Sequence, residues 1–233
     1  MKKIQQSTLS NNQLSNNHHN FKAILKGFWR FFWYDDSVAS WLVNVIVAFA
    51  VIKFLVYPGL GLLLGTPFPI VAVVSESMEH APENEILCGQ QFTAFQESFD
   101  NYWKVCGEWY ETRGIEKEEF QKFPFKNGFD KGDVIILWRA NSNVHLGDIL
   151  VFQGDKPQPI IHRVVKITEE NSGKRYYQTK GDHNSESIDS GVGEMHITQE
   201  RVYGKGVLRI PYLGWVKIGF VEVVKVFGIK IQR

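Results

Sequence analysis

The feature that most constrains this chain is a run of about twenty apolar residues. From residue 38 to residue 57 the sequence reads VASWLVNVIVAFAVIKFLVY, and only Asn44 and Lys53 interrupt the run. About twenty apolar residues are enough to cross the hydrocarbon core of a bilayer as a helix. No small-x-small cleavage site follows, so the sequence predicts a retained transmembrane anchor rather than a cleaved secretory signal. A buried core helix is the alternative, which Asn44 and Lys53 leave open.

The charges on either side of this run predict its orientation. The first charges after it are glutamates, beginning at Glu76, whereas a set of basic residues precedes it: Lys2, Lys3, Lys22, Lys26 and Arg30. Cytoplasmic flanks carry an excess of lysine and arginine, so the N-terminus is predicted to lie in the cytoplasm. We therefore expect a cell-membrane protein that is anchored in the lipid bilayer, with the chain after residue 57 outside the cytoplasm.

Composition divides the chain into four parts. Residues 1–37 are predicted to form a polar cytoplasmic tail, residues 38–57 the transmembrane helix, and residues 66–212 an extracytoplasmic domain. Residues 213–233 form a C-terminal amphipathic or membrane-associated segment.

In this last segment, apolar residues recur at helical spacing, but Lys217, Glu222 and Lys225 interrupt them. Each charge would cost about 2.5 to 3.5 kcal/mol at the centre of a bilayer, so an interfacial helix is preferred to a second span. The second span stays open, and the chain would then cross the membrane twice.

The extracytoplasmic domain is predicted to be mainly β. Residues 131–137 and 146–152 each read as a Gly-Asp turn followed by an apolar strand, and residues 69–75 form a β-branched run that leads to two serines. Residues 160–167 and 176–179 flank a turn-forming Asn-Ser-Gly sequence, which predicts a hairpin. The predicted fold class is an antiparallel β domain behind an N-terminal transmembrane helix.

An amphipathic helix is predicted within an insert at about residues 83–130. Apolar residues recur there near helical spacing: Phe92, Phe95, Phe99, Trp103, Cys106 and Trp109. Packing of this aromatic stripe on the sheet is favoured, and a lid over the site is the functional alternative. Acidic residues outnumber basic ones nine to three from residue 83 to residue 119, which disfavours binding of the insert to anionic lipid.

Cys88 and Cys106 are the only cysteines. In an extracytoplasmic segment this even count permits one disulfide bond, which would clamp the insert. Two unpaired thiols are the alternative, since Cys106 falls on the apolar stripe. No His or Cys partners stand at ligand spacing, so neither a metal site nor a cofactor is expected.

Overall composition excludes two classes of protein. The formal net charge is +1, so no global field would attract nucleic acid, and no nucleic-acid partner is expected. Hydrophobic residues make up 44% of the chain, which supplies a core and excludes wholesale disorder. The function has to be sought in individual residues.

Three short motifs carry the candidate chemistry. Ser-Glu-Ser-Met at residues 75–78 ends a predicted strand, His162 lies within an apolar strand, and Lys-Gly-Asp-His-Asn at residues 180–184 leads to Asp189. Each motif alone is weak, because a strand histidine is usually structural and Gly-Asp is ordinary turn chemistry. A serine becomes an effective nucleophile only when an adjacent base takes its proton, and a histidine can do so near neutral pH.

Taken together, and in this order behind an N-terminal anchor, the motifs resemble type I signal peptidases of the archaeal and endoplasmic-reticulum kind. The resemblance covers most of residues 38–216. It rests on the Ser-x-Ser-Met box, the base box Ile-His-Arg-Val at residues 161–164, the last box from Lys180 through Asp189, and residues 204–211. His162 stands where the bacterial kind carries a lysine, which points to the His-using branch.

The resemblance implies a serine endopeptidase that removes signal peptides from exported preproteins after small residues. Ser77 is then the nucleophile and His162 the general base. A carboxylate should hold the other imidazole nitrogen, for which Asp189 is the first choice and Asp182 the second. The hydroxyl of Ser75 and the backbone N–H of Ser77 would form the oxyanion hole.

Specificity for small residues requires shallow apolar pockets beside the nucleophile and the base. The resemblance assigns substrate contacts to the apolar residues that flank them: Val73, Val74, Met78, Ile160 and Ile161. Ordinary strand core is equally consistent for any one of these residues. An extended substrate would pair along the strand at residues 71–75.

The sequence departs from the family pattern in two places. Asp189 is followed by Ser-Gly where the family commonly has an arginine, so no arginine is available at that position to hold the acid. His80 stands where the family usually has a proline, and we expect it in a surface loop.

Two other classes of function stay open. A non-enzymatic, membrane-anchored β domain that binds a protein partner would leave Ser77 and His162 incidental. A self-cleaving protease with a lysine base, as in phage-repressor relatives, would be soluble, so the apolar run and His162 argue against it. The sequence does not indicate whether accessory subunits are needed.

Overall fold

The computed structural model describes residues 26–219, apart from residues 28, 32, 142, 156 and 217. It divides into two compact units, Met1–Gly59 and Leu60–Arg233. Most of the predicted cytoplasmic tail, and the C-terminal segment beyond residue 219, lie outside the described residues. The interfacial helix and the second span therefore both stay predictions.

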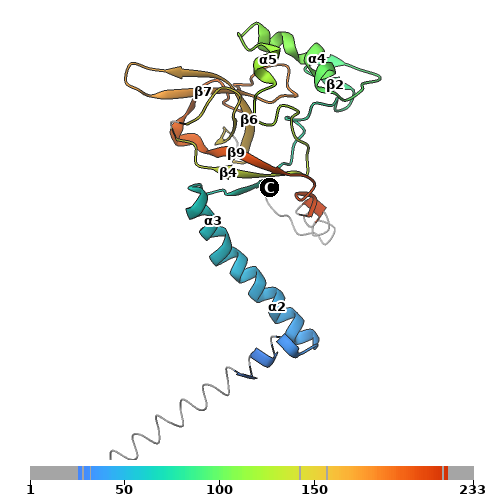
Figure 1. The fold of residues 1–233 in the computed structure, drawn as a ribbon, viewed down its shortest axis with the longest axis vertical. Coiled ribbons are helices and arrows are strands. Elements are labelled where there is room, and N and C mark those ends of the chain that lie inside the picture. Colours follow the sequence, from blue (N-terminus) through green and yellow to red (C-terminus); the bar gives the residue numbers. More distant parts are fainter. Residues whose placement is uncertain are drawn as a thin grey trace, which may run out of the picture. The chain divides into compact units, whose positions relative to one another are not determined.

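The apolar run forms a helix from Val38 to Leu64 that is long and apolar enough to cross a membrane. It consists of α2 (Val38–Val51), a π-helical turn (Ile52–Val56) and α3 (Tyr57–Leu64) (Figure 1). The Ser37 side chain caps its start by accepting a hydrogen bond from the Ser40 backbone N–H at 3.2 Å. Most of its apolar side chains are exposed, which argues against the core-helix alternative.

This helix is longer than the sequence predicted, because Pro58 does not end it. A proline removes one backbone donor, and its ring crowds the carbonyl four residues earlier. Directly before Pro58 the π-helical turn changes the hydrogen-bond spacing, and the Tyr57 N–H donates to the Ile52 carbonyl. The 27 residues extend about 40 Å, which exceeds the hydrocarbon thickness of about 30 Å.

A seven-stranded sheet forms the frame of the second unit, with every pairing antiparallel (Figure 1). The strand order is β1-β4-β9-β5-β6-β7-β8. The strands are β1 (Ile70–Ala72), β4 (Val134–Trp138), β5 (Ile149–Gln153), β6 (Pro159–Glu169), β7 (Arg175–Lys180), β8 (Ile197–Thr198) and β9 (Val202–Ile210), with a 3₁₀ turn (Gln199–Arg201) before the last. The predicted mainly β fold class is confirmed, as are the two Gly-Asp strands and the hairpin of β6 and β7.

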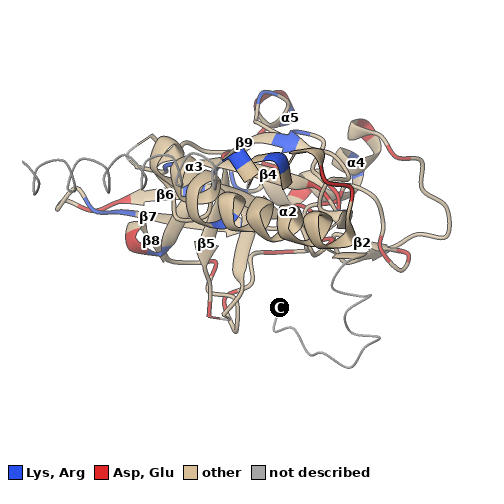
Figure 2. Cartoon of the chain, turned by 90° about the horizontal axis from the view of Figure 1, so that it is seen from below, with Lys and Arg blue, Asp and Glu red and all other residues tan. Residues whose placement is uncertain are grey.

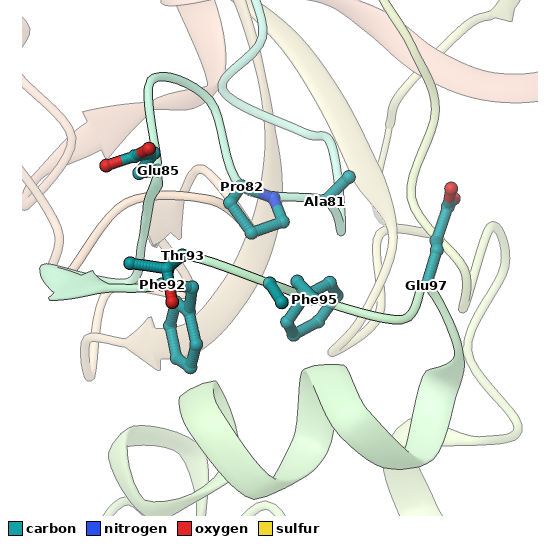
Figure 3. A pocket seen from close by; sticks show the side chains of 8 residues that line it. Ala81, Pro82, Glu85, Phe92, Thr93, Phe95 and Glu97 are labelled. Carbon is teal, nitrogen blue, oxygen red and sulfur yellow. The ribbon is translucent and has the colours of Figure 1, made fainter.

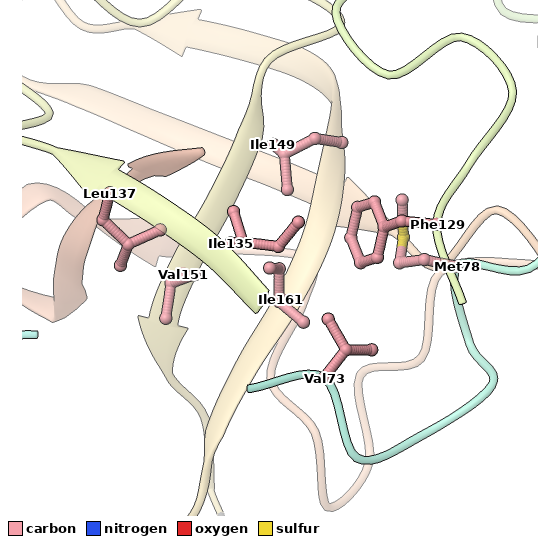
Figure 4. Close-up of a cluster of buried hydrophobic side chains, with 8 residues drawn as sticks. All are labelled: Val73, Met78, Phe129, Ile135, Leu137, Ile149, Val151 and Ile161. Atoms are coloured by element: carbon pink, nitrogen blue, oxygen red, sulfur yellow. The ribbon is translucent and has the colours of Figure 1, made fainter. Parts of the chain in front are cut away.

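The core beneath this sheet gathers residues from strands that are distant in sequence. Figure 4 shows the cluster of Val73, Met78, Phe129, Ile135, Leu137, Ile149, Val151 and Ile161. Three of the predicted substrate-contacting residues, Val73, Met78 and Ile161, therefore belong to the packed core. Met78 follows the proposed nucleophile directly, so its burial fixes the chain at that point.

The insert folds as a second cluster of aromatic side chains. It contains β2 (Ile86–Leu87), β3 (Gln90–Gln91), α4 (Phe99–Glu111) and α5 (Lys117–Phe120). The amphipathic helix is confirmed over α4, which buries Tyr102, Trp103, Cys106 and Tyr110. Phe92 and Phe95 precede the helix and pack against each other, with ring centroids 5.6 Å apart. The cluster includes Val165 of β6, so the insert packs on the sheet.

A disulfide bond joins Cys88 to Cys106 and resolves the alternative that the sequence left open. It ties the β2–β3 turn to α4. The loops beside α4 and β2 carry many of the acidic residues, whereas β9 carries Lys205 and Arg209 (Figure 2).

Candidate active site

The end of β1 delivers the two serines. Beyond Ala72 the pairing continues, with the Val73 N–H donating to the Asp133 carbonyl at 2.9 Å and the Gly132 N–H to the Val73 carbonyl at 2.9 Å. The chain then leaves the sheet, and the Ser77 carbonyl accepts a hydrogen bond from the His183 N–H at 3.0 Å. Backbone bonds on both sides therefore hold the segment that carries Ser77.

His162 lies in β6, opposite Leu150 of β5, and is buried. Its Nε2 lies 2.9 Å from the Ser77 Oγ, within hydrogen-bond reach. Its Nδ1 forms a hydrogen bond with the Glu194 Oε1. A carboxylate at Nδ1 assigns the proton to that nitrogen and leaves Nε2 free to accept the serine proton.

Glu194 is fully buried, and hydrogen bonds orient its carboxylate. The Thr179 Oγ1 donates to Oε1 at 3.2 Å, and the Ile188 backbone N–H donates to Oε2 at 2.6 Å. Backbone bonds hold the residue as well, because the Glu194 carbonyl accepts from the Thr179 N–H at 3.1 Å and its N–H donates to the Ile188 carbonyl at 3.2 Å. Both the side chain and the backbone of Glu194 are thus fixed toward His162.

The predictions that Asp189 or Asp182 holds the imidazole are wrong, since Glu194 occupies that position. Asp189 is exposed, and its carbonyl accepts from the Gly193 N–H at 2.8 Å in the turn that leads to Glu194. Glu194 takes this position because the turn after Asp189 brings the chain back to β7 five residues later, beside His162.

Asp182 has a different environment, since it pairs with Arg163. The Arg163 Nη2 lies 2.6 Å from the Asp182 Oδ2, and both side chains are fully buried. Burial alone raises the pKa of Asp182, but the charge of Arg163 and hydrogen bonds from His80 and Arg163 outweigh it and lower the pKa. Arg163 also donates to the carbonyls of Pro124, Gly147 and Phe125. The pair therefore braces the loop beneath the site.

The prediction of a surface position for His80 is also wrong. Its Nε2 lies 2.9 Å from the Asp182 Oδ2, and its ring stacks on Tyr102 with centroids 3.5 Å apart. Only 4% of its surface is exposed. Burial lowers the pKa of His80, against the raising effect of Asp182.

Gly181 lies so close to Ser77 and His162 that a side chain at this position would collide with both. A Cβ at this position would lie 2.7 Å from the Ser77 carbonyl oxygen and 2.9 Å from the His162 Nε2. Only a glycine leaves room for the serine and the imidazole to meet. Within the Lys-Gly-Asp motif, Gly181 is therefore a steric requirement of the Ser77–His162 contact.

The chain is similar in sequence to several known proteins. The signal peptidase complex catalytic subunit SEC11 of Zygosaccharomyces rouxii is 34% identical over 98 residues, which cover 40% of this chain and 59% of the relative. The corresponding subunits of Lachancea thermotolerans and Saccharomyces cerevisiae are 32% identical over 99 residues and 30% over 98 residues, with the same coverage. Over this stretch the chain is similar to signal peptidase complex catalytic subunits. The match spans 59% of the length of these curated relatives, and no protein-family model matches the chain.

Ser75 lies beside the serine that contacts the histidine. The two hydroxyl oxygens are 3.2 Å apart, and Ser75 is exposed. Of the residues predicted to contact substrate, Val74 is exposed and Ile160 is half-buried. Val73 and Met78 are only 1% and 0% exposed, and their contact with a substrate stays a prediction.

A fully buried lysine, Lys180, precedes Gly181 in the loop beside Ser77 and His162. Burial lowers its pKa to about 7, although Asp182 and Glu194 act to raise it. Its Nζ donates to the Gly181 and Asp182 carbonyls at 3.1 and 3.3 Å and reaches the Tyr110 hydroxyl at 3.4 Å. Among the hydrogen bonds of the described residues, the Ser77 Oγ meets His162 and Ser75 rather than this lysine.

A separate pocket lies on the insert, lined by Ala81, Pro82, Glu85, Phe92, Thr93, Ala94, Phe95 and Glu97. Figure 3 shows the carboxylates of Glu85 and Glu97 pointing away from the two phenyl rings. Neither Ser77 nor His162 lines this pocket. Within residues 26–219 as described, no group of three or more His, Cys, Asp or Glu side chains is arranged to hold a metal ion.

Sequence reasoning missed Glu194, Thr179 and the tyrosines that surround Asp182. The one signal for Glu194 is its position directly after a Gly-Val-Gly turn and just before the short strand β8. That signal is weak, because acidic residues commonly follow turns.

Proposed function

We propose that this chain is a membrane-anchored serine endopeptidase that removes signal peptides from preproteins after small residues. The observation that carries the proposal is the chain of contacts from Ser77 through His162 to Glu194, at the positions of the serine and base motifs. The similarity to signal peptidase catalytic subunits supports the substrate class. A non-enzymatic binding domain gives no reason for a serine hydroxyl to lie 2.9 Å from an oriented, buried histidine.

The mechanism begins with proton transfer from the Ser77 Oγ to the His162 Nε2. The oxygen attacks the carbonyl carbon of the scissile peptide bond and forms a tetrahedral oxyanion. Glu194 stabilises the imidazolium and keeps Nδ1 as the donor. His162 then gives the proton to the leaving amine, the C–N bond breaks, and an acyl-enzyme remains until water, deprotonated by the same imidazole, releases it.

The oxyanion needs donors that are in place before the reaction. The backbone N–H of Ser77 and the hydroxyl of Ser75 are our proposed pair, supported by the 3.2 Å distance between the two serine oxygens. Loss of one such donor costs about 3 kcal/mol of transition-state stabilisation.

Substrate binding uses the free edge of β1. Within the described residues β1 pairs on one side only, with β4, so an extended peptide can add as a strand along its other side. Val74 and Ile160 then face the substrate, above a floor that Val73, Met78 and Ile161 form. This arrangement provides main-chain affinity and shallow apolar contacts.

The test of this proposal is incubation of the detergent-solubilised protein with a preprotein, followed by sequencing of the new N-terminus. We expect a single cut after a small-x-small site by the wild-type chain and no cut by Ser77→Ala or His162→Ala at unchanged folding. Processing by either variant at near wild-type rate would refute the Ser-His mechanism. A folded wild-type protein that leaves the preprotein intact would refute the substrate class.

A further inference from the structure

The loop at residues 180–184 contacts both the candidate active site and the insert. On the side of the site, the His183 N–H donates to the Ser77 carbonyl at 3.0 Å. Gly181 packs against the same carbonyl and against the His162 imidazole. A shift of this loop therefore moves the nucleophile relative to its base.

On the other side, the insert donates three hydrogen bonds to the same loop. The Tyr102 hydroxyl donates to the Asp182 carbonyl at 3.0 Å, and the Tyr110 hydroxyl donates to the Asp182 Oδ1 at 3.2 Å. The Cys88 backbone N–H donates to the His183 carbonyl at 3.0 Å. Burial raises the pKa of both tyrosines well above the usual value, so their hydroxyls stay protonated and can donate.

The disulfide joins these contacts into one support. Tyr102, Cys106 and Tyr110 all lie on α4. The disulfide bond to Cys106 links Cys88, whose N–H donates to His183, to the same helix. Phe120 of α5 packs against both tyrosines, with ring centroids 6.1 and 4.9 Å away. The loop thus rests on a covalently closed aromatic cluster.

We propose that the insert is a positioning element for the nucleophile, in which Tyr102 and Tyr110 hold the residue 180–184 loop against Ser77. This inference rests on the proposed function, since it concerns the same serine and histidine. It replaces the lid that the sequence left as an alternative, because the insert bonds to the loop beneath the site. Neither tyrosine touches the reacting atoms, so both act through Asp182 and its neighbours.

Positioning of this kind has a measurable effect on turnover. Reaction requires the attacking oxygen and its base in a narrow geometry, and a displacement of about 1 Å can cost about 10²-fold in rate. A Tyr→Phe change removes one hydroxyl and keeps the ring packing. We therefore expect the double variant Tyr102→Phe/Tyr110→Phe to lower kcat by about 10- to 100-fold with little change in KM.

The matched control is Tyr177→Phe. Tyr177 is also fully buried, and its hydroxyl donates to the Gln199 Oε1 at 2.8 Å, in a cluster away from the loop. For each hydroxyl removed, the control should lower the melting temperature about as much as the double variant does, but it should leave kcat unchanged. A second variant, Cys88→Ser/Cys106→Ser, should lower kcat in the same way, as should reduction of the wild-type disulfide, with recovery on reoxidation.

Hydrogen exchange of the 181–184 backbone supplies a readout that does not need turnover. Faster exchange of the His183 N–H in the tyrosine double variant, but not in Tyr177→Phe, together with the selective loss of kcat, supports positioning. Unchanged exchange, or a kcat that falls no further than in the control, overturns it. If the wild-type protein fails to cut a preprotein, the proposed function fails, and the exchange comparison still decides whether the insert holds the loop.

Discussion

At the scale of single residues, the structure separates two carboxylates that look alike in the sequence. Glu194 accepts hydrogen bonds from a threonine hydroxyl and a backbone N–H and faces His162. Asp182 neutralises a buried arginine. The first arrangement serves a cation that forms during catalysis, whereas the second compensates a charge that is always present. Loss of Glu194 should therefore affect rate, and loss of Asp182 should affect stability.

We expect Asp182→Asn to lower the free energy of unfolding by about 3 to 5 kcal/mol at pH 7, because Arg163 is then left buried without its counter-charge. Asp182 has a lowered pKa in the folded state, compared with the usual 3.8. Its stabilisation is therefore fully present above about pH 4 and is lost as the pH falls below that value. The difference between wild type and variant in denaturant unfolding should shrink on acidification from pH 5 to pH 3.

The control for this comparison is Asp155→Asn. Asp155 is 52% exposed and lies 3.8 Å from Arg201, so this pair should contribute little. An Asp182→Asn variant as stable as Asp155→Asn at pH 7 would show that the Arg163 pair does not brace the loop.

At the scale of elements, the sequence predicted the helices and strands that depend on residues close together in the chain. The strands at residues 131–137 and 146–152, the β6–β7 hairpin and the amphipathic α4 follow from turn residues and side-chain periodicity. The helix continues beyond its predicted end because a π-helical turn accommodates Pro58. Glu194 could not be predicted, because only the pairing of β6 with β7 brings its turn to His162.

The turn that leads to Glu194 is itself testable. Gly193 has a φ of +73°, a conformation that favours glycine, and a Cβ there would lie 2.8 Å from the Asp155 Oδ1. Gly193→Ala should shift Glu194 and lower kcat by about 10-fold or more. Gly173→Ala is the matched control, since Gly173 has a φ of +77° at the hairpin turn with open space around it. Equal kcat values in the two variants would show that the conformation of the turn at Gly193 does not affect catalysis.

At the scale of the whole molecule, an apolar helix precedes a β domain that carries the candidate triad. The basic flank before the helix favours a cytoplasmic N-terminus. A protease added outside intact cells should then cleave within the acidic insert and spare a tag at Lys2. Removal of the tag from outside, with the insert protected, would show the opposite orientation. The site would then lie on the cytoplasmic side, away from exported substrates.

The most direct test of the Ser77–His162–Glu194 triad is the kcat of Glu194→Gln beside that of Asp189→Asn on the same preprotein. A neutral amide at residue 194 cannot stabilise the imidazolium, so we expect Glu194→Gln to lower kcat by as much as about 10⁴-fold, with little change in melting temperature. Asp189 is exposed and does not contact His162, so Asp189→Asn should keep near wild-type turnover. A Glu194→Gln variant that turns over normally, or an Asp189→Asn variant that does not, would contradict the triad.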